Sequence, residues 1–473
     1  MSASELTSLS ARAAVEKLKS GEVSPLELID AAEERIAAVD PAVNALPTLC
    51  LDQARDAAKA LKAPDDPGPG WLAGLPIVVK DVTEVAGVRT THGSPIFADH
   101  VSERDDISVE VLKRNGAIVI GKSNTPEFAA GANTFNEVFG KTRNPWNTDT
   151  TCGGSSGGAA VAVATGMSWL ATGTDLGGSL RTPASYCSVV GLRPSPGRVA
   201  AGPVRDPFQS LSMNGPMARN VADVALMLDA EVGEHPGFPL SLAAPAEPFQ
   251  AAAASPAAPA RVGFTPDLGI GPVDPEVAEI CRAGAARFAE AGSVVEESCP
   301  DFSGALETFQ TLRAAAFVVS RAPLLDKHRD KMKPEMIWNI EKGMEQTSGD
   351  ISEALAARGA LYARVAAWFE DHDVLAVPAA IVPPFDVDIR YIESVGDHEF
   401  GNYVDWLYIT FAITLTACPV VCVPCGFTKS GLPVGLQLVG RPRGEAEVLR
   451  YAAKFEEMSG LADLVPMDPR PPA

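Results

Sequence analysis

Apolar residues along the chain recur with two spacings, one typical of strands and one typical of helices. Short runs of β-forming residues predict strands at 75–79, 117–120, 261–264, 374–377, 420–423 and 434–439. Apolar positions that repeat every three or four residues predict helices at 107–114, 219–230, 275–290 and 445–457. Strands that alternate with helices predict an α/β fold, with a mixed, largely parallel β-sheet between layers of α-helices. The stretch 241–260, rich in Ala and Pro, is predicted to be a surface loop.

The N-terminal part of the chain predicts helices without intervening strands. Its clearest helix start is the segment Ser24-Pro-Leu-Glu27, in which the serine caps the helix, the proline suits the first turn and the glutamate completes a capping box. No long polar linker interrupts the chain. We therefore predict a single domain over residues 1–473, with a helical arm at 1–65 and a catalytic core at 74–200.

Composition narrows the classes of function. The chain has 39 Lys and Arg against 60 Asp and Glu, and a net charge of −21 repels phosphate backbones, so we expect no nucleic-acid partner. It has neither a signal-peptide pattern at its start nor an uncharged apolar run of ~18–20 residues, so we expect a cytoplasmic protein that does not bind membranes. The eight cysteines lie mostly in apolar segments, as reduced thiols do. The group Cys418, Cys422 and Cys425 lacks a second CxxC or a nearby histidine, so we expect no metal.

Two segments match known sequence motifs but lie in the wrong predicted structural context, so we reject both matches. Residues 116–123 fit the phosphate-loop pattern GxxxxGK[ST], but the four residues between the two glycines are themselves a predicted strand. Residues 153–157 fit the GxSxG pattern of a nucleophile elbow, but a polar loop precedes them where an elbow follows a strand. Nothing around the six histidines marks any of them as a base.

The chemistry is concentrated in two loops rich in Ser and Gly, at 153–158 and 173–184. Glycines let the backbone approach a ligand closely, and consecutive N–H groups beside a serine suit the oxyanion of an acyl transfer. A serine needs a neighbour to take its proton, and Lys or a carboxylate remain as candidates. Lys80 ends an apolar run, and burial there would lower its pKa and leave a neutral amine. The alternative is that Lys80 pairs with Asp81 at the end of the strand.

These loops closely resemble the amidase signature family. The resemblance rests on Gly153-Gly-Ser-Ser-Gly-Gly158, on Gly173-Thr-Asp-Leu-Gly-Gly-Ser-Leu-Arg-Thr-Pro-Ala184 and on Gly191-Leu-Arg-Pro194, which together form a signature segment at 153–194. Further family landmarks extend it over nearly the whole chain, at 74–81, 121–128, 142–146, 215–218 and 431–437. The resemblance implies a serine hydrolase of amide C–N bonds that uses no metal and no organic cofactor.

The resemblance also implies a Ser–cisSer–Lys triad. Ser179 is expected to attack the carbonyl carbon and form an acyl-enzyme. Ser155, after a cis peptide bond, is expected to relay the proton between Ser179 and the base Lys80. The expected oxyanion hole consists of the backbone N–H groups of Leu176, Gly177, Gly178 and Ser179.

Neighbouring residues are expected to support the triad and bind the substrate. Asp175 and Arg181 are expected to hold the shape of the second loop, and Ser156 either contacts Lys80 or caps a turn. Substrate-binding candidates are Cys152, Gly153, Met213, Tyr403 and Trp406. The last two belong to an aromatic stretch at 398–411, which also contains Tyr408 and Phe411 and for which core packing is the alternative.

The substrate is expected to be a small carboxamide, an aryl amide or an anilide, cleaved by a stand-alone enzyme. One alternative is the glutamine-hydrolysing amidase subunit of an amidotransferase. Such subunits usually carry Ser-Ile-Arg-Gln-Pro where this chain has Ser179-Leu-Arg-Thr-Pro183, which favours the stand-alone enzyme. A nucleotide-binding or non-catalytic protein is the second alternative. The expected partner is a small-molecule amide, and a homodimer is left open.

Overall fold

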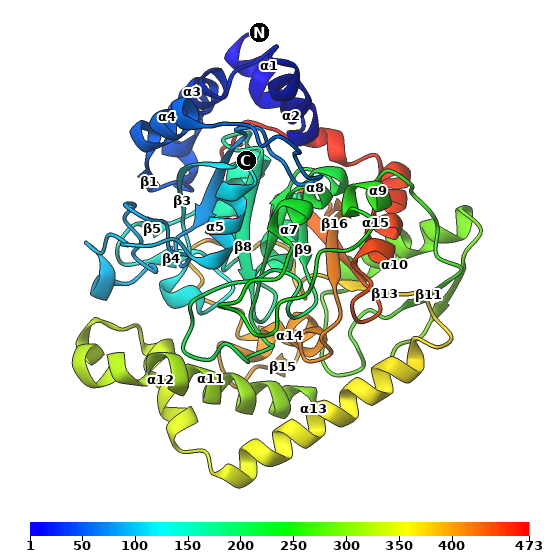
Figure 1. The fold of residues 1–473 in the computed structure, drawn as a ribbon. Helices are drawn as coiled ribbons and strands as arrows, with labels where there is room; N and C mark the ends of the chain where they lie inside the picture. The colour runs from blue at the N-terminus through cyan, green and yellow to red at the C-terminus, as the bar shows by residue number, and fades with distance from the viewer. Residues whose placement is uncertain (473) are drawn as a thin grey trace.

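One sheet of eleven strands forms the centre of the computed structural model, which describes residues 1–472 (Figure 1). Residue 473, the end of the predicted domain, lies outside the described residues. The strand order is β1-β3-β2-β8-β10-β9-β16-β17-β13-β11-β12. The strands are β1 (Thr48–Leu49), β2 (Pro76–Lys80), β3 (Ile118–Ser123), β8 (Leu170–Asp175), β9 (Val190–Arg193), β10 (Met213–Ala218), β11 (Arg261–Phe264), β12 (Val294–Glu297), β13 (Val374–Pro378), β16 (Val420–Phe427) and β17 (Pro433–Val439).

The sheet is mixed, as predicted. Parallel pairs join β3, β2 and β8 on one flank and β13, β11 and β12 on the other. Every pair between β8 and β13 is antiparallel, and the short strand β1 is antiparallel to β3. Three two-stranded ribbons lie outside the sheet: β4 (Phe135–Asn136) with β5 (Gly140–Lys141), β6 (Arg143–Asn144) with β7 (Asn147–Thr151), and β14 (Ser394–Val395) with β15 (His398–Glu399).

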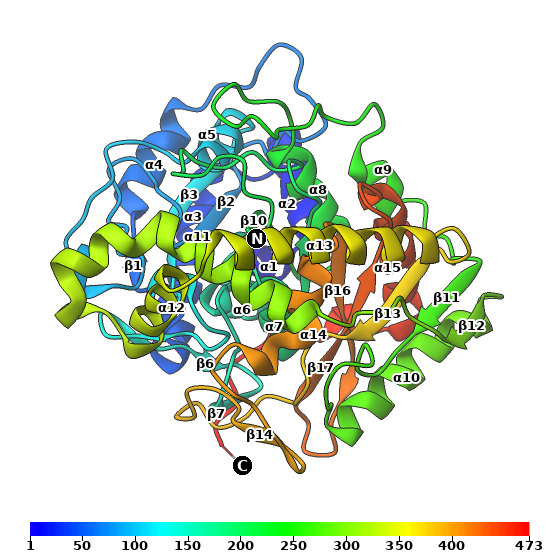
Figure 2. The same ribbon diagram turned by 90° about the horizontal axis from the view of Figure 1, so that it is seen from below.

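Helices cover both faces of the sheet, which completes the predicted α/β fold (Figure 2). They are α1 (Ala3–Ser8), α2 (Ala11–Ser20), α3 (Pro25–Val43), α4 (Leu51–Ala60), α5 (Ile107–Arg114), α6 (Gly157–Ala164), α7 (Arg181–Cys187), α8 (Val221–Glu231), α9 (Phe249–Ala253), α10 (Pro275–Glu290), α11 (Ala305–His328), α12 (Pro334–Met344), α13 (Ser348–Trp368), α14 (Tyr408–Thr414) and α15 (Glu445–Ser459). Within residues 1–472, no helix combines the length and the apolar character needed to cross a membrane.

Helix α6 is buried along its whole length, because it contains only Gly, Ala and Val. A helix that is apolar on every side belongs in a core. It packs against β2, β3, β8 and β10, and it therefore fixes the loop that precedes it over the middle of the sheet.

The N-terminal arm consists of α1 to α4, and its predicted helix start is confirmed. The hydroxyl of Ser24 accepts a hydrogen bond from the Glu27 N–H, and the Glu27 carboxylate accepts one from the Ser24 N–H at 2.8 Å. The arm is fixed to the core by Asp223 of α8, whose buried carboxylate accepts hydrogen bonds from the N–H groups of Ala11 and Arg12 at 2.8 and 3.0 Å. One buried acid thus caps α2 and joins the arm to the sheet layer.

The prediction of a surface loop at 241–260 is only partly right. The segment contains α9, and Phe249 in that helix is 2 % exposed. The carboxylate of Asp229 in α8 accepts hydrogen bonds from the N–H groups of Phe249 and Gln250 and so caps the helix. That carboxylate is distant in sequence, so the local composition does not reveal the helix.

A second group of helices lies beside one edge of the fold. Helix α11 packs against α12, α13 and α14, along one side of the molecule (Figure 1). Its apolar residues belong to a second hydrophobic cluster with residues of α13, α14 and the adjoining strands, in which the rings of Phe309 and Phe411 stack at 4.2 Å. Sequence periodicity did not assign these helices over 305–368, although they supply a wall of the pocket described below.

Glu231, at the end of α8, generates a prediction about stability. Its carboxyl is 1 % exposed, no described residue donates a hydrogen bond to it, and burial raises its pKa from 4.5 to about 8. Between these two values the folded state holds more protons than the unfolded state, so this group makes the protein less stable as the pH rises. We expect Glu231→Gln to leave the melting temperature unchanged at about pH 4 and to raise it at about pH 9, where the free energy of unfolding should gain on the order of a few kcal/mol.

Differential scanning calorimetry at the two pH values measures this effect. The exposed Glu234→Gln serves as the control and should change neither melting temperature. An equal shift of the Glu231→Gln melting temperature at both pH values would contradict the prediction.

Candidate active site

Two neighbouring parallel strands bring the site together. Strand β2 ends at Lys80 and β8 ends at Asp175, and the two strands pair in parallel, so their carboxyl ends meet at the same edge of the sheet. The loop after β8 carries Ser179, and the loop before the buried helix α6 carries Ser155. The sheet topology therefore gathers residues that lie far apart in the sequence.

Lys80 is fully buried and is surrounded by hydroxyl groups. Its Nζ lies 2.7 Å from the Oγ of Ser155, 2.8 Å from the Oγ of Ser156 and 2.8 Å from the Oγ1 of Thr174. Among residues 1–472, no carboxylate forms an ion pair with it. Burial lowers the pKa of Lys80 well below its usual 10.5, against a smaller opposing effect of Asp175. The site thus favours a neutral amine, which can accept a proton.

The alternative in which Lys80 pairs with Asp81 is wrong. Successive side chains of a strand point to opposite faces, so the two residues diverge at the end of β2. Asp81 accepts hydrogen bonds from the N–H and hydroxyl of Thr91, and it lies 3.9 Å from the Nζ of Lys122. Lys122 is the lysine of the rejected phosphate-loop pattern, and it is buried in β3 with its Nζ against Thr90. Its place inside the protein supports that rejection.

The first Ser/Gly loop is held in place from both sides. The peptide bond between Gly154 and Ser155 is cis, as the resemblance implied. The hydroxyl of Thr134 donates to the carbonyl of Gly153 at 2.8 Å and accepts from the Gly157 N–H at 3.2 Å. A Cβ at position 157 would lie 2.2 Å from that hydroxyl oxygen, so only glycine fits there.

The signature loop, residues 176–180, is organised by a buried ion pair. Asp175 accepts hydrogen bonds from the N–H groups of Gly178 at 2.9 Å and Leu180 at 3.1 Å. Arg181 binds both oxygens of the same carboxylate, at 2.8 and 2.9 Å, and Arg193 lies 3.3 Å away. Burial by itself would raise the pKa of Asp175, but the two arginines outweigh it and hold that pKa below its usual range. The predicted supporting roles of Asp175 and Arg181 fit this geometry.

One member of the predicted oxyanion hole needs correction. The N–H of Gly178 is already bound to Asp175 and cannot serve an oxyanion. The N–H groups of Leu176, Gly177 and Ser179 donate to no described residue, and all three residues are partly exposed. The loop turns at Gly178, whose φ is +119° and whose Cβ would lie 2.4 Å from the Oγ1 of Thr410. The free donors therefore face outward, while Gly178 anchors the loop inward.

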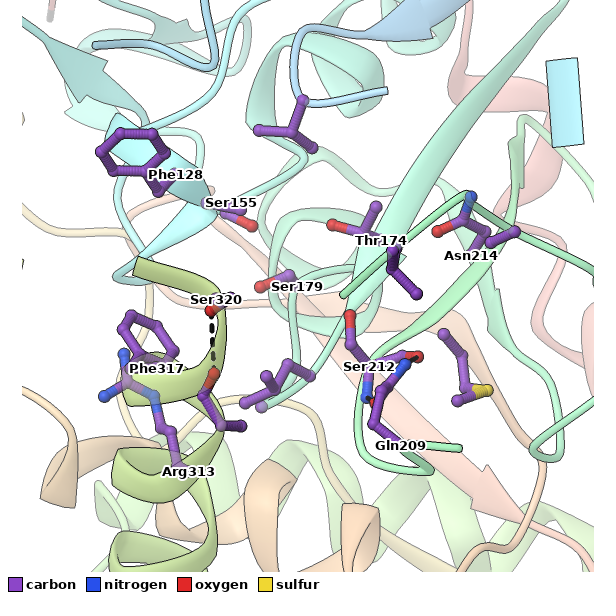
Figure 3. Close-up of a pocket in the computed structure, with 18 of the residues that line it drawn as sticks. Phe128, Ser155, Thr174, Ser179, Gln209, Ser212, Asn214, Arg313, Phe317 and Ser320 are labelled. Carbon is purple, nitrogen blue, oxygen red and sulfur yellow. Dashed lines mark hydrogen bonds between the residues drawn. The ribbon is translucent and has the colours of Figure 1, made fainter. Parts of the chain in front are cut away.

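A pocket opens over the two serines (Figure 3). Ser155, Thr174 and Ser179 line its floor. Its walls come from the loop between β9 and β10, from helix α11 and from Phe128. The loop contributes Arg205, Asp206, Gln209 and Ser212, and Asn214 follows at the start of β10. The rings of Phe309, Phe317 and Phe128 make much of the remainder apolar.

Of the predicted substrate-binding residues, Met213 and Tyr403 line the pocket and three others do not. Cys152 is fully buried, with its Sγ directed at the carbonyls of Thr142 and Gly153. Gly153 lies against Tyr186 and Pro183, away from the pocket. Trp406 is 1 % exposed and donates its indole N–H to the carbonyl of Tyr403. Nearness in sequence and aromatic character do not determine which way a side chain points. Cys152 packs in the main hydrophobic core, and Trp406 packs in the second cluster with Tyr408 and Phe411.

Comparison with known proteins identifies the family. The family model described as Amidase matches residues 27–449. The chain belongs to the Amidase family. An acylamidase of Rhodococcus erythropolis is 34% identical, over 97% of both chains, and a glutamyl-tRNA(Gln) amidotransferase subunit of Moorella thermoacetica is 36% identical, over 96% of this chain and 97% of its own length. Among solved structures, a bacterial aryl acylamidase of the amidase signature family has a TM-score of 0.90 and 27% identity, over 97% of this chain and 99% of that one.

Membership in the Amidase family makes the chain a hydrolase of amide C–N bonds. The family motifs did not reveal every residue of the site. Thr174, which contacts Lys80, lies inside the family motif Gly173-Thr-Asp, so the sequence did mark it as a candidate. The pocket residues of α11 had none, because they lie far beyond the nucleophile in the sequence and match no motif.

The buried pair beneath the signature loop generates a second prediction. Asp175→Asn leaves Arg181 and Arg193 buried without an anion, so we expect it to lower the free energy of unfolding by about 3 kcal/mol or more. Urea denaturation followed by circular dichroism measures this loss. Asp149→Asn is the control, because Asp149 is exposed and faces Arg143 at 3.9 Å, and it should stay within ~0.5 kcal/mol of the wild type. Equal stability of both variants would mean that the pair does not hold the loop.

Proposed function

We propose that this chain is a stand-alone amide hydrolase that cleaves small carboxamides, aryl amides and anilides, with Ser179 as its nucleophile. The observation that carries the proposal is the 2.7 Å contact between the Nζ of Lys80 and the Oγ of Ser155, at a buried site without a counter-ion among the described residues. That site opens into the pocket lined by Ser179. A neutral lysine, a serine relay and an accessible serine are the parts that a serine amidase needs.

In the proposed mechanism, Lys80 accepts a proton from Ser155 while Ser155 accepts one from Ser179. The Ser179 oxygen attacks the carbonyl carbon, and the N–H groups of Leu176, Gly177 and Ser179 stabilise the oxyanion. Ser155 then returns the proton to the leaving nitrogen, so that ammonia or an amine departs and an acyl-enzyme remains. Water, activated by the same Ser155 and Lys80, hydrolyses the acyl-enzyme.

Several features support a stand-alone enzyme that accepts apolar or aryl groups. The aromatic rings of Phe128, Phe309 and Phe317 line the pocket, and such rings pack well against aryl groups. The acylamidase relative covers 97% of this chain, and the segment Ser179-Leu-Arg-Thr-Pro183 differs from the motif usual in amidotransferase subunits. All eight cysteines are free thiols, which suits a reducing cytoplasm. Because amidotransferase subunits are relatives of similar identity, hydrolysis of glutamine within a larger assembly is the second candidate.

A substrate panel tests this proposal with the chain purified alone. We expect release of amine or ammonia from aliphatic amides, aryl amides or anilides, and a loss of about a thousandfold or more in Ser179→Ala and Lys80→Ala. Ser4→Ala, an exposed serine of α1, is the control and should retain full activity. Turnover that survives in Ser179→Ala would exclude this nucleophile. Activity on glutamine alone, and only with copurified subunits, would favour the second candidate.

The hydroxyl groups around Lys80 generate a prediction about pH. Only the neutral amine can accept a proton, so kcat/KM should rise with pH through the lowered pKa of Lys80. Thr174 accepts a hydrogen bond that is stronger from an ammonium than from an amine. We therefore expect Thr174→Val to lower this pKa further and to move the acidic limb of the kcat/KM profile to lower pH. A limb that moves to higher pH would show that Thr174 does not stabilise the ammonium.

A further inference from the structure

Helix α11 presents a cationic wall to the pocket. Arg313, Phe317, Ser320 and Arg321 all line the pocket, and their spacing of three, four and eight residues places them on one face of the helix. We call these four residues the α11 wall. Figure 3 shows Arg313, Phe317 and Ser320 on one side of Ser179, and Gln209, Ser212 and Asn214 on the other.

Arg321 has little to bind within the protein. Its guanidinium stacks on the ring of Phe128, with the Cζ 4.7 Å from the ring centroid, and its one hydrogen bond, of 3.4 Å, goes to the carbonyl of the adjacent Ser320. Among the residues that the structure describes, no acid forms an ion pair with it. Burial lowers the pKa of Arg321 to about 10, which reflects the cost of a cation in this setting. Most of its five N–H donors therefore remain available on the pocket side.

Arg313 strengthens the positive charge of the same wall. It is 4 % exposed and lies between the rings of Phe317 and Tyr403, at 4.3 and 5.3 Å from their centroids. It donates hydrogen bonds to the hydroxyl of Tyr403 at 2.8 Å and to the amide oxygen of Asn339. Both partners are neutral, so its charge is also uncompensated by any acid within residues 1–472.

The carboxylates near the α11 wall form an ion pair or hydrogen bonds with residues outside it. Glu335 forms an ion pair with Arg390 at 2.7 Å. Glu127 accepts hydrogen bonds from the hydroxyl of Ser94 at 2.7 Å and from the N–H of Lys333 at 2.9 Å.

The acids that line the pocket belong to its other walls. Asp106 caps α5 and accepts hydrogen bonds from the N–H groups of Ser108 and Gly202. Asp206 lies at the exposed rim, next to Arg205. Arg205 also lines the pocket, but it is exposed to solvent at the rim. The shielded positive charge without a paired acid among the described residues therefore lies on the side of α11, in a protein whose net charge is −21.

We propose that the α11 wall is a carboxylate-binding subsite, and that the substrate is an amide whose end remote from the scissile bond carries a carboxylate. The planar guanidinium of Arg321 binds that carboxylate through two parallel N–H groups, Arg313 adds its charge, and Phe128 holds the guanidinium in place. The proposal rests on the amide hydrolysis proposed above and specifies its substrate class. Apolar parts of the substrate then pack between Phe317 and Phe309, while the carbonyl lies over Ser179.

Pairs of substrates that differ in one carboxylate test the subsite. The ratio of the two kcat/KM values within a pair stays the same when a variant loses activity equally on both members. Adipamate is compared with hexanamide, which places the carboxylate on the acyl side, and para-acetamidobenzoate with para-methylacetanilide, which places it on the amine side. We expect the wild type to prefer the carboxylate in one of the two pairs by about 10- to 100-fold in kcat/KM. We expect Arg321→Gln to abolish this preference and Arg321→Lys to restore part of it. Arg329→Gln is the control, because it removes the same charge from an exposed position paired with Glu341, and it should preserve the preference.

Binding to the Ser179→Ala protein gives a readout that does not depend on turnover. Isothermal titration calorimetry should show that adipamate or para-acetamidobenzoate binds more tightly than its neutral counterpart, and that adding Arg321→Gln removes this difference. Melting curves confirm that each variant is folded. A wild type that prefers the neutral member of both pairs, or a preference that survives Arg321→Gln, would overturn the subsite. Failure of the wild type to hydrolyse any of the four amides would instead count against the proposed function, and calorimetry would still decide the subsite.

Discussion

The carboxylate of Asp175 is the group on which the rest of the site depends. It binds Arg181 through both oxygens, lies close to Arg193 and accepts the N–H groups of Gly178 and Leu180. A buried carboxylate requires such partners, because an unpaired charge in a low dielectric is unstable. Because the two arginines pair with this carboxylate, its effect on Lys80 is smaller than the effect of burial, and Asp175 forms no ion pair with Lys80. The same ion pair thus shapes the loop that carries Ser179, the proposed nucleophile, and is compatible with the neutral Lys80 that the proposed mechanism needs.

The sheet converts this local arrangement into a site. Strands β2 and β8 pair in parallel, so Lys80 and Asp175 end at one edge, and the fully buried α6 brings Ser155 to the same edge. Three hydroxyl groups then surround the Lys80 amine without supplying charge. Strands and a buried helix position these residues, which suits the proposed proton relay, because each of its distances must stay within hydrogen-bonding range.

The pocket separates chemistry from recognition. Its floor holds the serines and the free N–H groups of the signature loop. In the proposed mechanism these groups act on the carbonyl group, which every amide has. Polar side chains line the wall made by the β9–β10 loop, whereas α11 supplies both apolar rings and two guanidiniums without a paired acid among the described residues. If the proposed function holds, selectivity among amides depends on wall residues outside the signature motifs, which can change while the residues around Lys80 stay the same.

The sequence by itself determined the α/β class and the Ser24 helix cap, and it predicted the triad residues Ser155, Ser179 and Lys80 and the rejection of the phosphate loop. These features are visible because periodicity, capping and catalytic motifs are written in residues close together in the chain. Only the tertiary structure decided that Lys80 forms no pair with Asp81 and that the N–H of Gly178 binds Asp175 and not an oxyanion. It also decided that Cys152 and Trp406 belong to the core and that α11 forms the cationic wall. Those outcomes depend on contacts between segments that are separated in sequence, because burial and hydrogen-bond partners are set by how the elements pack and not by the residues next to them.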